Sequence, residues 1–384
     1  MKMRSILLSV LAIAVLASCA KDNGLLENPD VNAPEAMVTL RLKGNGGTRV
    51  VGLPTDLETK NKKVSNLTVF FFNGDDLVNK VYLADSELTD NKVKGVKTKA
   101  SAKTVVVIAN IGSDQTTTGI FAGVTNKTSL VAATGSLTDK TSLTQSDQNV
   151  YMSGEGTISY ADGGKIGSAA VALNFVSARI DLKVIDFSGA IAKGSVYDTH
   201  FKVSDIYLMR VQSATHFLPA GSGDAVKYIE KGSRVFWGGS AWESTTTAEP
   251  SDYVVNAEYK VATIPTTLTS NKMEDLGHWY VFDNNEVDDP TVLVVKVDWF
   301  KDGVSPAVPL FFNVTFNGTD QVQIRSGHTY TVSLKLNGNL KPEGDGGTGG
   351  GGEEDPDTPT VDAAVDITVT AAEWTPKIID KEWN

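Results

Sequence analysis

The stretch Met37-Val38-Thr39-Leu40-Arg41-Leu42-Lys43 places Val38, Leu40 and Leu42 at every second position. Successive side chains of a β-strand point to opposite faces of the sheet, so a period of two is typical of a strand with one buried face. The stretch therefore predicts a half-buried strand over residues 37–43.

Short apolar runs separated by turn residues continue through the rest of the chain, without alternating helical patterns. This spacing favours an all-β fold with two β-sandwich domains, which we expect at 50–176 and 177–340. The predicted strands are Asn66–Phe72, Val78–Leu83, Lys103–Ala109, Val150–Ser153, Ala169–Phe175, Arg179–Phe187, Lys202–Val211, Lys227–Phe236, Tyr253–Val261, Thr291–Trp299, Val308–Phe316 and Thr329–Leu336.

The N-terminus reads as a lipoprotein signal over residues 1–19. Lys2 and Arg4 precede an apolar run that ends in Leu16-Ala17-Ser18-Cys19, and Cys19 is the only cysteine among 384 residues. We expect lipid on the Cys19 sulfur and cleavage of the signal just before this residue. An ordinary signal peptide with an incidental cysteine is the alternative. A transmembrane anchor is disfavoured because the apolar run is shorter than the roughly 18–20 residues that span a bilayer.

The segment 20–49 has the properties of a removable propeptide that carries the strand 37–43. A glycine-rich loop follows this strand and ends at Arg49. Burial of Val38, Leu40 and Leu42 would contribute roughly 5–8 kcal/mol. Removal of the strand would leave an apolar groove between bare sheet edges that could pair with another chain. Arg49 could instead be a solvated loop residue, and a lysine-specific protease could cleave at one of the nearby lysines.

A second isolated strand pattern lies at the C-terminus, in residues 361–384, behind a glycine-rich and acidic linker at 341–360. A single strand must pair with a sheet edge, either in its own chain or in another. If it fills the groove of a neighbour, the contact is head to tail and builds a filament. Its predicted donor residues are Val365, Ile367, Val369, Ala371 and Trp374.

Four segments, in this order and behind the lipoprotein signal, resemble the major fimbrial subunits of Bacteroidales, the fimbrillins or type V pilins. They are Thr48–Val50 with Lys63–Phe70, Thr104–Asn110, Ile324–Tyr330 leading into alternating Val332, Leu334 and Leu336, and Val369–Trp374.

The resemblance implies two transthyretin-like β-sandwich domains and export as a lipoprotein precursor. It also implies cleavage between Arg49 and Val50 by an arginine-specific protease, and a C-terminal strand from a neighbour in place of strand 37–43. The expected partners are copies of the chain and accessory fimbrial subunits, and the expected role is structural and adhesive. An accessory or anchor subunit that keeps its N-terminal strand is the first alternative.

Composition and motifs favour a protein that is neither an enzyme nor a nucleic-acid binder. The formal net charge of −11 argues against nucleic acid. The four histidines are scattered, and no catalytic or nucleotide-binding motif is present, so we expect no metal and no cofactor apart from the precursor's lipid. A surface glycan-binding lipoprotein is the alternative from another class, with Trp237 and Trp242 as its closest tryptophan pair outside the C-terminal tail.

Overall fold

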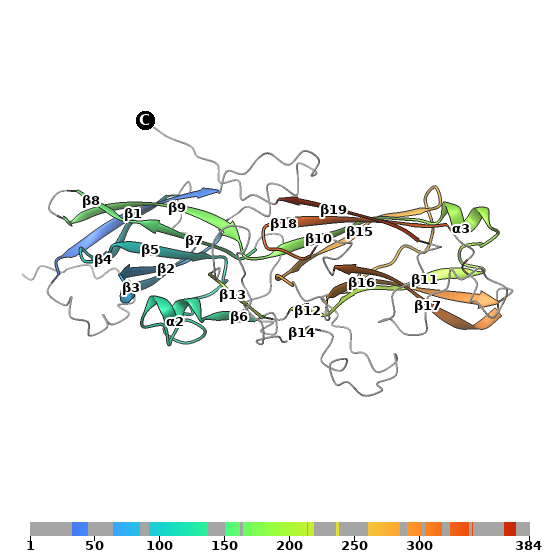
Figure 1. Ribbon diagram of the computed structural model, residues 1–384, viewed down its shortest axis with the longest axis horizontal. Helices are drawn as coiled ribbons and strands as arrows, with labels where there is room; N and C mark the ends of the chain where they lie inside the picture. The colour runs from blue at the N-terminus through green and yellow to red at the C-terminus, as the bar shows by residue number, and fades with distance from the viewer. Residues whose placement is uncertain are drawn as a thin grey trace, which may run out of the picture.

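The computed structural model is an elongated molecule of two β-sandwich domains placed end to end (Figure 1). This confirms the predicted all-β fold. The structure describes residues 33–44, 64–84, 92–136, 150–161, 164–212, 214–218, 236–237, 260–284, 290–301, 304–316, 323–337, 340 and 365–373. Among these residues, no helix is long and apolar enough to cross a membrane.

The N-terminal domain is a curled sheet in the order β3-β2-β5-β7-β9-β1-β4, with β8 paired to β9. Its strands are β1 (Glu35–Gly44), β2 (Leu67–Asn73), β3 (Asp76–Leu83), β4 (Lys92–Lys99), β5 (Thr104–Ala109), β7 (Met152–Thr157), β8 (Ser159–Ala161) and β9 (Ile166–Phe175).

Strands β2 and β5 are apolar at almost every position because both of their faces are buried. One face, with Val69 and Phe71, packs in the core of the N-terminal domain. The other face, with Phe70 and Phe72, lies under the segment that carries α2 (Lys127–Val131), and Phe121 from that segment meets Phe70 edge to face at 5.2 Å between ring centroids. The sequences of these two strands are therefore almost continuously apolar, as expected for strands that are covered on both faces.

The C-terminal domain consists of two sheets packed face to face. One has the order β15-β10-β18-β19 and the other β11-β16-β17. Their strands are β10 (Ala178–Asp186), β11 (Phe201–Met209), β15 (Lys272–Val281), β16 (Thr291–Lys301), β17 (Val304–Phe316), β18 (His328–Leu336) and β19 (Val365–Glu373), and α3 (Ser188–Ala192) follows β10.

The two domains share a continuous apolar core. Tyr151 of the N-terminal domain lies 5.9 Å from Phe217 and 6.3 Å from Phe282, measured between ring centroids. A short ladder between β6 (Thr134–Ser136) and β13 (Ala214–His216) also joins them, and β12 (Val211–Gln212) pairs with β14 (Phe236–Trp237) nearby. In Figure 1, β9 runs on into β10 across the junction, with only Val176 and Ser177 between the two strands.

Most predicted strands are confirmed within the described residues, but two long ones are missing from the prediction. Strand β4 reads KVKGVKTK, where lysines outnumber apolar residues, and β15 contains adjacent acids and Gly277. The predicted strand Lys227–Phe236, except Phe236 in β14, and most of Tyr253–Val261 lie outside the described residues.

Candidate assembly site

Strand β1 lies inside the N-terminal sheet, with a neighbour on each side. It pairs parallel with β9, from Met37 opposite Ile166 to Gly44 opposite Leu173, and antiparallel with β4, from Glu35 opposite Lys99 to Arg41 opposite Lys92. The strand predicted over 37–43 therefore extends over Glu35–Gly44. Because both of its edges are paired, its loss would leave two unpaired edges facing each other.

The alternation predicted for β1 matches its burial. Val38 and Leu40 are fully buried and Leu42 is 2% exposed, whereas Met37 on the other face is 44% exposed. The three buried side chains belong to the core of the N-terminal domain, together with Val69, Phe71, Val105, Val107, Val171 and Leu173. Strand β1 thus contributes three side chains to this core as well as one strand to the sheet.

The pairing of β1 with β4 contains one bulge. It falls between the pairs Val38–Val96 and Leu40–Val93, where Gly95 has φ +68°. Glycine adopts this conformation without strain. Two residues of β4 lie between Val93 and Val96, whereas one residue of β1 lies between their partners. The bulge absorbs the extra residue, so that both valines remain buried.

Strand β19 is paired within its own chain, and β18 is its one neighbour among the described residues. It runs antiparallel to β18 at the edge of the sheet, from Val365 opposite Leu336 to Glu373 opposite His328. The predicted donor residues fall in phase with the core face of β18: Ile367 lies opposite Leu334, Val369 opposite Val332 and Ala371 opposite Tyr330. The sequence left open whether this strand pairs in its own chain, and the structure shows that it does.

The remaining predicted residues are not all described. Cys19, Arg49, Val50 and Trp374 lie outside the described residues, as do Trp242 and the linker 341–360. Trp237 lies in β14, opposite Val211. The structure brings Val38, Leu40 and Leu42 together in one core but leaves the predicted processing residues as expectations.

A hydrogen-bonded joint connects the sheets that hold β1 and β19, and sequence reasoning did not assign it a role. The Ser326 hydroxyl donates to the Asp283 carboxylate, which also accepts the Ser326 backbone N–H, and the same hydroxyl lies within hydrogen-bond distance of the Val176 carbonyl. The Gly327 N–H donates to the Ser177 carbonyl at 2.8 Å. The turn before β18 is therefore attached to the link between β9 and β10.

Tyr330 holds the same turn from the other side. Its hydroxyl donates to the Gln323 carbonyl at 2.6 Å and accepts the Arg325 N–H at 2.8 Å. Burial raises the pKa of this hydroxyl, so it remains a donor at physiological pH. The Ile324–Tyr330 motif of the sequence thus forms this joint, and Asp283 is the partner that the motif itself could not reveal.

Comparison with known proteins identifies the family. The model of the FimA-like major fimbrial subunit protein, C-terminal domain, matches residues 177–374, and that of the major fimbrial subunit protein (FimA) matches residues 36–174. The chain belongs to the FimA-like major fimbrial subunit family. It is accordingly a fimbrial structural protein of the cell surface, in a family whose members polymerise and are not enzymes. No curated protein sequence matches it significantly.

Solved structures share the fold over nearly the whole chain. A candidate cell adhesion protein of Bacteroides eggerthii is 26% identical, with a TM-score of 0.66 over 91% of this chain and 98% of that one. A candidate cell adhesion protein of Parabacteroides distasonis is 17% identical, with a TM-score of 0.59 over 90% and 99%. The fimbrilin of Porphyromonas gingivalis W83 is also 17% identical, with a TM-score of 0.57 over 89% and 98%.

A metal centre has no support among the described residues, where no group of three or more His, Cys, Asp or Glu side chains could hold an ion. The described histidines make local contacts; His200 Nδ1, for example, accepts the Val196 N–H at 3.1 Å. The features of this fimbrial subunit that bear on assembly are its strands.

Proposed function

We propose that this chain is the shaft subunit of a surface fimbria and polymerises by exchange of β1 for a neighbour's C-terminal strand. The precursor would reach the outer membrane as a lipoprotein on Cys19. Cleavage between Arg49 and Val50 would then release the propeptide together with β1. The observation that carries the proposal is the interior position of β1, because only an interior strand leaves a two-sided slot when it is removed.

The slot would recognise a strand by its backbone and by its apolar period. β9 and β4 would both offer unpaired N–H and C=O groups, and the core beneath would lose the cover of Val38, Leu40 and Leu42. Burial of three such side chains contributes roughly 5–8 kcal/mol, in addition to the ladder hydrogen bonds. An incoming strand with apolar residues at every second position restores both.

Strand β19 fits this requirement and is held less firmly than β1. Val365, Ile367, Val369 and Ala371 recur with the period of the buried residues of β1. Among the described strands of its own chain, β19 has a single neighbour, β18. Transfer into a slot with two neighbours gains a second ladder, which supports a donor role for this strand and for Trp374 just beyond it.

Substitution of the cleavage residue tests the first step. We expect Arg49→Ala to leave a lipidated, monomeric precursor at the cell surface, whereas Arg41→Ala, a matched change within the exposed face of β1, should still polymerise. The measurements are N-terminal sequencing of the surface protein and the ladder of SDS-resistant polymers. Ladders from the Arg49→Ala variant with an uncut N-terminus would show that β1 need not leave.

Deletion of residues 361–384 tests the second step. The truncated chain should fold and be cleaved but should not extend a polymer. Normal filaments from this variant would exclude the C-terminal strand as donor. If the natural surface protein keeps its N-terminus and ends a filament, the chain is an accessory or anchor subunit. Micromolar binding of the uncleaved monomer on a glycan array would favour the glycan-binding alternative.

A further inference from the structure

Strand β4, which forms one wall of the β1 slot, carries only basic charges. It contains Lys92, Lys94, Lys97 and Lys99 and no acid. Lys97 is exposed and Lys99 half-buried, while Val93, Val96 and Thr98 are buried. At the far side of the slot, exposed Lys165 precedes β9, and its carbonyl accepts the Met37 N–H at 2.9 Å. We call Lys97, Lys99 and Lys165 the basic strip.

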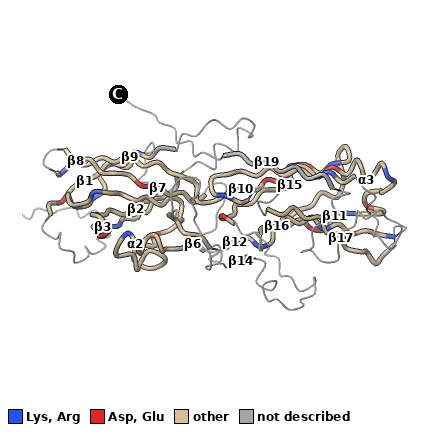
Figure 2. Tube along the Cα trace, in the orientation of Figure 1, with Lys and Arg blue, Asp and Glu red and all other residues tan. Residues whose placement is uncertain are grey.

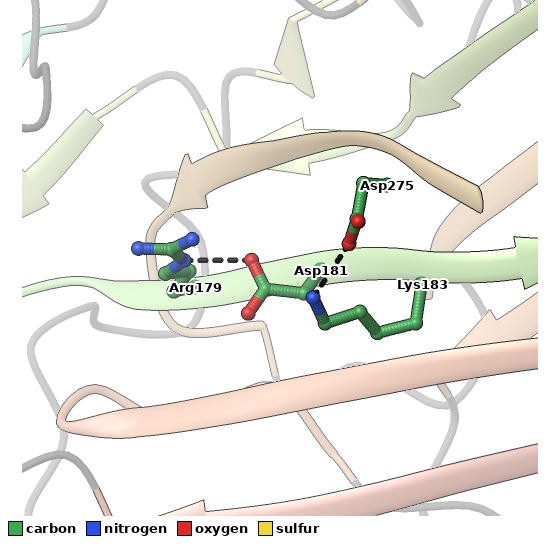
Figure 3. Close-up of polar contacts among 4 residues, drawn as sticks. All are labelled: Arg179, Asp181, Lys183 and Asp275. Carbon is green, nitrogen blue, oxygen red and sulfur yellow. Dashed lines mark hydrogen bonds and ion pairs between the residues drawn. The ribbon is translucent and has the colours of Figure 1, made fainter. Parts of the chain in front are cut away.

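Several charges in the sheet of the C-terminal domain are paired with each other. Arg179 donates to Asp181 at 2.7 Å and Lys183 to Asp275 at 2.7 Å (Figure 3). Neither Lys97 nor Lys165 takes part in an ion pair between described residues. Figure 2 shows these charges as blue and red segments of the two domains. In a chain with a net charge of −11, a strip with only positive charges provides a place where an acidic segment can bind.

The acidic segment of opposite charge is the linker before β19. From Pro342 to Asp366 the sequence contains no lysine or arginine. Its acids are Glu343, Asp345, Glu353, Glu354, Asp355, Asp357, Asp362 and Asp366. The densest group, residues 353–357, ends shortly before the strand that the proposed function assigns as donor.

We propose that the basic strip binds the acidic linker of a second copy of this chain and so guides that copy's C-terminal strand into the β1 slot. This inference rests on the proposed strand exchange and names the surface that would receive the donor chain. Charges at the rim of a contact mainly raise the association rate and its salt dependence. The strip would therefore accelerate capture, while the apolar face of the strand would hold it.

The dimensions are compatible with this contact. An extended chain covers at most about 3.3–3.6 Å per residue, so the residues between Glu353 and Val365 can span about 40 Å. The eight residues of β4 extend over about 26 Å. A donor strand seated beside β4 can thus place the acids of its linker along the strip. The attraction acts within about 8–10 Å at physiological ionic strength.

Lysines on a strand can also serve only to protect a sheet edge from unwanted pairing. That role depends on the presence of charge and not on its sign, so a lysine-to-glutamate exchange would preserve it. Guidance of an acidic linker depends on the sign. A charge reversal on both partners distinguishes the two.

The test measures capture of a labelled synthetic peptide of residues 343–384 by the full-length chain after treatment with an arginine-specific protease. We expect the double variant Lys97→Glu with Lys99→Glu to lower the capture rate about 10-fold at about 0.05 M salt, and high salt to remove most of the difference. The matched control, Lys193→Glu with Lys202→Glu, changes the net charge equally at exposed positions of the C-terminal domain and should leave the rate unchanged. Lys165→Glu should act in the same direction as the double variant.

The decisive arm uses a peptide with Glu353→Lys, Glu354→Lys and Asp355→Lys. This peptide should be captured slowly by the parent chain and quickly by the Lys97→Glu, Lys99→Glu variant. Capture at one rate for every combination and salt concentration would overturn the inference while leaving strand exchange intact. Absence of capture by the cleaved parent chain under all conditions would overturn the proposed strand exchange itself, and this inference with it.

Discussion

β1 and β19 are regular strands of similar length, ten and nine residues, yet one lies in the interior of its sheet and the other at the edge. β1 lies between β9 and β4 and covers part of a core, while β19 lies at the edge of its sheet, with β18 as its one neighbour within the described part of the chain. A strand held on both sides is difficult to replace unless its covalent connection is cut. An edge strand can detach while the sheet behind it persists. The difference suits β1 as the occupant of a slot and β19 as a strand available for another slot.

Deletion of each strand is the strongest way to break this comparison. Loss of residues 33–44 should remove roughly 5–8 kcal/mol of apolar burial. This is comparable to the whole stability of a typical domain, so the N-terminal domain should be strongly destabilised as long as no other strand fills the slot. Loss of residues 361–384 should leave both domains folded, with a lower Tm for the C-terminal domain. Circular dichroism and thermal melts check both. A monomeric β1-deleted chain with the Tm of the parent would contradict the comparison.

Substitution of one buried side chain on each strand by alanine sharpens the comparison between β1 and β19. Leu40→Ala should destabilise the N-terminal domain by about 2–5 kcal/mol because Leu40 is fully buried in a packed core. Ile367→Ala should have a smaller effect on the C-terminal domain of the monomer, since β19 lies at the edge of the described sheet, next to β18. Urea unfolding measures both. The control is Met37→Ala on the exposed face of β1, with an expected change within about 0.5 kcal/mol. Equal losses for Leu40 and Ile367 would remove the distinction.

Hydrogen exchange compares the two strands without any substitution. Amides of β1 that bond to β9 or β4 should exchange through global unfolding of their domain. Amides of β19 that bond to β18 should exchange through local detachment, at least about tenfold faster. Mass spectrometry of peptic peptides covering 35–44 and 365–373 reads both rates. Equal protection of the two peptides would mean that β19 is as firmly held as β1.

The joint at Ser326 offers the smallest expected effect. Ser326→Ala removes the hydroxyl that bonds to Asp283 and Val176, which should cost about 1–2 kcal/mol. Because this joint connects the link after β9 to the turn before β18, the two unfolding transitions should also separate. Differential scanning calorimetry detects the change, and Ser168→Ala at an exposed position of β9 is the control. An unaltered melt would show that the domains are coupled by their apolar contacts alone.

The sequence predicted the strands whose apolar period is regular, and it failed where lysine or glycine interrupts that period. β1 was predicted because Val38, Leu40 and Leu42 share one face, whereas β4 shows only Val93 and Val96 on either side of a bulge at Gly95. No local pattern indicates that β1 pairs with β9, because parallel strands from distant parts of the chain are matched only in the folded core. The sequence likewise predicted β19 but left its partner open, because the linker 341–360 separates this strand from the rest of the chain.

The run from β9 through Val176 and Ser177 into β10 has a mechanical consequence. β1 lies parallel to β9, and β18 lies parallel to β10, so strands on both domains are attached side by side along one ribbon. In a filament built by the proposed exchange, the donor strand would take the place of β1 beside β9, and a pull along the filament would load its ladder and that of β18 in shear, where many hydrogen bonds resist at once. Under the proposed exchange, the ribbon would thus be suited to transmit tension from one subunit to the next.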